Sequence, residues 1–185
     1  MTRSRTAGFS LPELLIALLL GGVLSTALMQ ALLLETRLSQ RLGRGLRERQ
    51  LGQRALELVR QEALQASWLA AEGQVPLAGG CSLAGRRVVL QLGTASGVIT
   101  YSVGAAPSSI WRGRVLMRCG PAYGLAGEMG QGEAQNRVLL DALPADDGFV
   151  LEGTAAGSLQ VRLARQLAAG ERMEQTLALP ALRLS

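Results

Sequence analysis

Residues 14–34 read LLIALLLGGVLSTALMQALLL and contain no charged residue. A helix over these 21 residues, rising about 1.5 Å per residue, is long enough to cross a bilayer core of about 30 Å. The run is also longer than the apolar core of an ordinary secretory signal, which has roughly 7–15 residues. It therefore predicts a membrane-spanning helix.

A short basic segment and a single acid precede this run. Residues 1–8 read MTRSRTAG and end in Gly8, which has no side chain and lets a protease approach its backbone closely. Pro12 is tolerated in a first helical turn, where its missing N–H would be unpaired anyway. Glu13 is the unusual residue, because a charge deep in a bilayer costs about 3 kcal/mol. An acid at the headgroup level, however, suits the start of a helix.

The string AGFSLPELL over residues 7–15, followed by the apolar run, resembles the signal sequence of type IV prepilins and type II secretion pseudopilins. The resemblance covers residues 3–34. It implies that a prepilin peptidase cuts between Gly8 and Phe9 and methylates the new amine of Phe9, and that Glu13 acts in assembly. The implied partners are this peptidase, other major and minor pilins or pseudopilins and, indirectly, an assembly platform and its ATPase.

The same resemblance implies a place in the cell. The protein would sit in the bacterial inner membrane with one span and an extracytoplasmic head, and would later enter a pilus or pseudopilus. Charge near the span conflicts with this orientation, because five arginines follow the span within residues 37–49 and only Arg3 and Arg5 precede it. The positive-inside rule alone would place the head in the cytoplasm. The string at residues 7–15 is the more specific signal, so we expect the extracytoplasmic head.

Residues 35–72 are polar but keep a helical pattern of apolar positions. The residues that largely share one face at helical spacing are Leu51, Ala55, Leu58, Val59, Glu62, Ala63 and Ala66. Gly43, Gly45 and Gly52 interrupt the pattern, each costing about 1 kcal/mol relative to alanine. We expect one long helix over residues 9–71, loosened between Gly43 and Gly52.

The sequence changes character where glycine and proline end the helical pattern, at residues 73–80. Alternating apolar and β-branched residues predict strands over 86–92, 97–103, 109–117, 137–143, 149–152, 159–163 and 176–179. Residues 120–135 are rich in glycine and predict a loop.

The predicted fold is therefore α+β, a long helix followed by a small antiparallel β-sheet head. Its parts are a leader over 1–8, a transmembrane and assembly helix over 9–34, an amphipathic stem over 35–72 and a head over 73–185.

The chain offers little for catalysis. It has no histidine, which removes the commonest general base and metal ligand. Its two cysteines, Cys81 and Cys119, cannot form a four-ligand zinc site by themselves, but they could form a disulfide in an extracytoplasmic head. The acids at 141, 146, 147 and 152 match no cation loop, and Asp146-Asp147 is typical of a turn. We expect a structural protein with no catalytic residue, metal or cofactor.

Net charge does not decide whether DNA is a partner. All 19 basic residues are arginine, and the formal charge is +5. Removal of the leader with Arg3 and Arg5 leaves 17 arginines against 14 acids, a net charge of +3. Such a modest excess is weak support for nucleic-acid binding, which usually needs a basic patch.

Two further interpretations concern the type of protein. Ser25-Thr26-Ala27 offers a cleavage site after Ala27, so the chain could instead be a secreted or signal-anchored protein unrelated to pili. Within the prepilin resemblance, Ile99-Thr100-Tyr101 followed by Ile110-Trp111-Arg112 is similar to minor pilins of the W/J type. The arginine-rich stem also favours a minor subunit over a major one.

Overall fold

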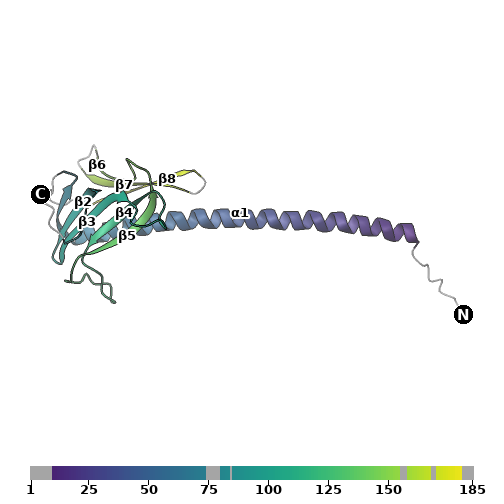
Figure 1. Ribbon diagram of the computed structural model, residues 1–185, viewed down its shortest axis with the longest axis horizontal. Helices are drawn as coiled ribbons and strands as arrows, with labels where there is room; N and C mark the ends of the chain where they lie inside the picture. The colour runs from purple at the N-terminus through teal and green to yellow at the C-terminus, as the bar shows by residue number, and fades with distance from the viewer. Residues whose placement is uncertain (1–9, 74–79, 84, 155–157, 168–169, 181–185) are drawn as a thin grey trace. The chain divides into compact units, whose positions relative to one another are not determined.

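The computed structural model describes residues 10–73, 80–83, 85–154, 158–167 and 170–180, with positions 37, 38 and 41 described by their backbone only. Within these residues, one helix is followed by eight strands (Figure 1). The helix, α1, covers Leu11–Gln65. The chain divides into two units, Met1–Leu46 and Arg47–Ser185, and α1 contributes residues to both.

The first unit contains the apolar part of α1. The segment Leu11–Thr36 has 26 residues and a mean hydropathy of 2.0, so its length and composition would allow it to cross a membrane. None of the side chains described in this segment is buried. The expected apolar helix is therefore present, and its surface has no partner within the described chain.

The second unit contains a five-stranded antiparallel sheet in the order β1-β2-β3-β4-β5. Its strands are β1 (Ala66–Ala71), β2 (Arg86–Thr94), β3 (Gly97–Ala105), β4 (Arg114–Gly120) and β5 (Gln135–Leu143). The hairpin between β2 and β3 closes through Ala95 and Ser96, with Thr94 opposite Gly97. Gly97 has φ +133°, a conformation that favours glycine.

A three-stranded antiparallel sheet, in the order β6-β7-β8, completes the second unit. Its strands are β6 (Phe149–Gly153), β7 (Leu159–Gln166) and β8 (Arg172–Ala178). The end of α1 and both sheets share one hydrophobic core. Helix α1 contributes Ala55, Leu56, Val59 and Ala63, and the strands contribute residues such as Leu90, Ile99, Leu116, Phe149 and Leu163.

The predicted helix was too long at its end. It was expected to reach residue 71, but α1 ends at Gln65 and the next six residues form β1. In β1, which pairs with β2, Leu69 and Ala70 are completely buried. Trp68 also lies over Gly93 of β2, where an added Cβ would overlap the indole ring. Tertiary packing therefore outweighs the helical propensity of these residues.

The expected loosening between Gly43 and Gly52 is absent, because α1 is continuous through all three glycines. Gly52 is buried, and a Cβ added there would overlap the side-chain amide of Gln175 in β8. The buried face is also shifted from the expected one. Ala55, Val59, Glu62 and Ala63 are buried as expected, but Leu56 replaces Leu51, which is 41% exposed.

Most strand predictions are confirmed with altered ends, and the α+β class is confirmed. The strand expected at 109–117 is wrong in its first half, because β4 begins at Arg114. Residues 109–113 instead turn toward β5, where the Ala142 N–H donates to the Arg112 carbonyl at 2.6 Å. Strand β8 begins at Arg172, four residues before the expected strand. Residues 121–134 form the expected loop, with one isolated bridge between Tyr123 and Met129.

Candidate functional site

The amino-terminal site begins where the described chain begins. Gly8 and Phe9, the expected processing residues, lie outside the described residues. Glu13 is in the first turn of α1 and is exposed. Its side chain therefore lies on the exposed surface of the helix.

Ser10 explains why α1 starts at Leu11. Its carbonyl accepts the backbone N–H groups of Glu13 and Leu14 at 3.0 and 3.2 Å. Its hydroxyl donates to a Glu13 carboxylate oxygen at 3.4 Å. Ser and Glu three residues apart are the residues of a capping box, and Pro12 between them needs no N–H acceptor. The Ser10-x-x-Glu13 spacing could have been read from the sequence, but the prediction did not use it.

The head contains the expected disulfide. Cys81 and Cys119 are bonded with their Cα atoms 6.1 Å apart. Cys119 lies in β4, whereas Cys81 lies in the segment between β1 and β2. The Asn136 side chain of β5 donates to the nearby Ser82 carbonyl at 3.5 Å. The disulfide thus fastens this segment to β4 of the five-stranded sheet.

Glu62 is the centre of a buried polar cluster in the head. Its side chain has no exposed surface and accepts hydrogen bonds from Arg118 Nε at 2.6 Å, from the Tyr123 hydroxyl at 2.7 Å and from the Tyr101 hydroxyl. Burial raises the pKa of Tyr101 and of Tyr123, and the nearby Glu62 carboxylate raises both further. Both tyrosines therefore remain hydrogen-bond donors. The cluster joins α1, β3, β4 and the loop after β4.

A second polar cluster contacts α1 at Glu48, close to the residue where the second unit begins. Arg165 of β7 is 1% exposed and forms ion pairs with Glu48 at 2.7 Å and Asp141 at 3.3 Å. It also donates to the Glu48 carbonyl at 3.0 Å. Arg112 pairs with the same two acids, and its hydrogen bond to Glu48 raises the pKa of the Arg112 guanidinium. Sequence inspection missed both clusters, apart from placing Glu62 on the apolar face of the helix.

Comparison with known families gives one match. Residues 3–29 match the prokaryotic N-terminal methylation motif. The chain carries a methylation motif. The match is consistent with the type IV prepilin and pseudopilin family. Comparison with curated proteins and with solved structures found no match.

The methylation motif and the apolar helix overlap. Gly8, Phe9 and Glu13 all lie within the matched residues, and the apolar segment Leu11–Thr36 runs seven residues past their end. Together they support a pilin-like precursor that is anchored in the membrane by one segment. The whole second unit, Arg47–Ser185, lies outside the match.

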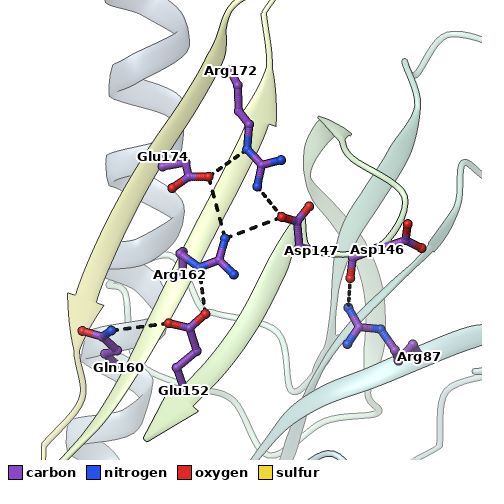
Figure 2. A network of polar contacts seen from close by, with 8 residues as sticks. All are labelled: Arg87, Asp146, Asp147, Glu152, Gln160, Arg162, Arg172 and Glu174. Atoms are coloured by element: carbon purple, nitrogen blue, oxygen red, sulfur yellow. Dashed lines mark hydrogen bonds and ion pairs between the residues drawn. The ribbon is translucent and has the colours of Figure 1, made fainter. Parts of the chain in front are cut away.

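The carboxylates considered as a metal site are occupied by other groups. Asp141 pairs with Arg112 and Arg165 as described above, and Asp146-Asp147 lie in a turn as expected. Figure 2 shows Asp147 between Arg162 and Arg172. Glu152 accepts a hydrogen bond from Arg162 at 2.8 Å. The hydrogen bond from Arg172 lowers the pKa of Asp147, and the one from Arg162 lowers that of Glu152.

This network joins three carboxylates to two arginines on the three-stranded sheet and in the turn before it. Glu174 of β8 accepts from Arg172 at 2.7 Å and lies 3.7 Å from Arg162, and Gln160 donates to Glu152 at 3.5 Å (Figure 2). In the described residues, no group of three His, Cys, Asp or Glu side chains is arranged to hold a metal ion. The described head also has a shallow groove of about 390 Å³, lined by Gln53, Leu56, Glu57, Gln175, Thr176 and Leu177.

Proposed function

We propose that this protein is a minor pilin or pseudopilin. It is made as an inner-membrane precursor, cut between Gly8 and Phe9 by a prepilin peptidase, and built into a type IV pilus or type II secretion pseudopilus. The observation that carries the proposal is the methylation motif joined without a break to an exposed apolar helix of 26 residues. Such a helix needs lipid before assembly and neighbouring subunits afterwards, because its apolar surface has no cover in its own described chain.

Glu13 has a specific part in this assembly. Cleavage creates a positive amine at Phe9, four residues before Glu13. In a bundle of apolar helices both charges would be costly unless they are paired. An ion pair between Glu13 and the methylated amine of a neighbouring subunit satisfies both and fixes the axial register of the helices. The pair forms only after cleavage, so processing precedes assembly.

The head lies outside the cytoplasm in this proposal. The disulfide between Cys81 and Cys119 supports this orientation, because disulfides persist in oxidising compartments and are rare in the cytosol. This argument opposes the charge bias of the five arginines that follow the span, which predicts the reverse orientation.

A structural subunit fits the head better than an enzyme does. The charged side chains of its clusters are paired with one another, and the arginine-rich stem favours a minor subunit. The similarity to W/J-type minor pilins rests on two sequence strings, and these differ in how far they are buried. Tyr101 is buried against Glu62, whereas Ile110 is 78% exposed on the turn before β4. The peptidase and other pilins are direct partners, and the platform and its ATPase act indirectly.

The test is recovery of the protein in filaments. An epitope-tagged chain, expressed at its native level, should appear in the sheared filament fraction of cells that have the prepilin peptidase and the assembly ATPase. It should stay in the inner membrane when either is deleted. Recovery of a soluble periplasmic form in all three strains would instead support an ordinary signal peptide cleaved after Ala27.

A further inference from the structure

We infer that the stem of this protein selects a partner subunit whose own stem is acidic and disfavours a second copy of this chain. The inference rests on the proposed function and names the partner for the segment Leu34–Leu46, called here the basic stem. This segment lies wholly within the first unit.

The arginines of the basic stem fall on one side of α1. Arg37, Arg41 and Arg44 follow one another at intervals of four and three residues, which spans about a sixth of the helix circumference. Arg44 is exposed, and its guanidinium donates only to the Gln40 carbonyl, at 3.3 Å, among the described contacts. Between residues 35 and 46, three arginines face one glutamate, Glu35, so this part carries a net charge of +2.

An exposed apolar strip runs beside these arginines. Leu34, Leu42 and Leu46 are 66%, 61% and 59% exposed and lie within about a third of the helix circumference. A leucine strip beside a line of like charges is suited to packing against another helix, with ion pairs along its border.

Lipid cannot cover the far end of this strip. If the uncharged run 14–34 fills the bilayer core, Leu42 and Leu46 lie roughly 12 and 18 Å beyond the core along α1. The headgroup layer on each side is only about 5–8 Å thick. Anionic headgroups could reach Arg37, but the two leucines need an apolar protein surface.

Charge then decides which protein surface fits. Stems of two copies side by side in a filament would bring their arginines together at similar heights, and like charges at an interface suppress that pairing. A stem with carboxylates at matching positions would form ion pairs across the border while covering the leucines. The sequence continues with Arg47 and Arg49, which adds to the same preference.

The test uses a charge-reversed variant of this protein as the partner with an acidic stem. A reversed variant, Arg37→Glu, Arg41→Glu and Arg44→Glu, has an acidic stem and the same leucines. Wild-type and reversed mature chains with different tags are reconstituted together in neutral phosphatidylcholine vesicles at low salt, each with a photoreactive p-benzoylphenylalanine in place of Ser39. With equal amounts of the two chains, mixed crosslinks should exceed the sum of the two like pairs by about fivefold, because three ion pairs together contribute roughly that factor.

Two controls separate position from total charge. The variant Arg54→Glu, Arg114→Glu, Arg137→Glu changes the net charge equally at exposed positions outside the basic stem, and it should not raise the mixed yield. Salt at about 1 M, where the screening length is about 3 Å, should lower the mixed yield to that of random pairing, which equals the sum of the two like pairs. Leu42→Gln with Leu46→Gln in both chains should lower the mixed yield.

A mixed yield at low salt no greater than the sum of the two like pairs would overturn the inference, as would an equal effect of the control variant. So would a Ser39 probe that labels phosphatidylglycerol, when this lipid is added, in preference to the reversed chain. Cleavage of the precursor of every variant is measured separately, in the cells that express it. Failure of the mixed pair with normal cleavage overturns the inference alone, whereas an uncut wild-type precursor overturns the proposed function.

Discussion

At the residue scale, Glu62 is a charged side chain on the buried face of α1, with no exposed surface. Its charge is matched by Arg118, which is itself only 3% exposed. Glu62→Ala would leave the buried Arg118 without its counter-ion. We expect it to lower the free energy of unfolding by about 3–5 kcal/mol, measured by urea unfolding of the full chain in detergent.

The matched control lies on the opposite, exposed face of the same helix. Glu57 pairs with Arg60 at 3.0 Å, but both side chains are 47% exposed. Glu57→Ala should leave the unfolding midpoint nearly unchanged, because exposed pairs are well solvated. If Glu62→Ala and Glu57→Ala shift the midpoint equally, the buried cluster does not hold the head on α1.

Glu13 gives the second prediction at this scale. Glu13→Ala and Glu13→Gln should leave cleavage after Gly8 largely intact, while reducing the amount of protein in sheared filaments. Gln keeps the shape and removes the charge, so both variants should behave alike. Normal incorporation of both at native expression would remove Glu13 from assembly and leave it as the headgroup-level start of α1.

At the scale of elements, the three-stranded sheet should respond to acid through Asp147 and Glu152. Neighbouring arginines lower both pKa values below the ordinary values of 3.8 and 4.5. A carboxylate whose folded pKa is lowered stabilises the fold above its unfolded pKa, and this stabilisation is lost as the pH falls through the folded pKa. The melting temperature should therefore fall below about pH 4.5.

A double variant isolates this contribution from that of the other acids. Asp147→Asn with Glu152→Gln should melt lower than the wild type at pH 7, with the difference shrinking toward pH 3. The measurement is the melting temperature of both proteins across this range at low salt. A constant difference between them would show that the ion pairs in Figure 2 do not set the acid response.

The end of α1 shows why the boundaries of the elements were harder to predict than their presence. The apolar run and the spacing of Ala55, Val59 and Ala63 are local patterns, and they predicted the helix and most of its buried face. The switch to β1 at Ala66 depends on pairing with Leu92 and Gln91, which lie more than twenty residues away. Gly52 appeared to be a weak point, but it makes room for Gln175 of β8, a contact between residues distant in sequence.

At the scale of the whole molecule, the amino-terminal part was the more predictable one. Its signal is contiguous, since Gly8, Phe9, Glu13 and the apolar run follow one another. The head had only alternating patterns, which gave strands but neither their order nor their division into two sheets. Its polar clusters join residues such as Glu48 and Arg165, 117 positions apart, so no local sequence pattern predicts them.

The central claim concerns the mature amino terminus of the membrane-anchored protein. Mass spectrometry of the purified chain, from cells with and without prepilin peptidase, measures it directly. With the peptidase, the protein should begin at N-methylated Phe9 and retain the whole apolar helix; without it, residues 1–8 should remain. A mature chain that begins at Leu28, or one that keeps residues 1–8 in both strains, would contradict the account.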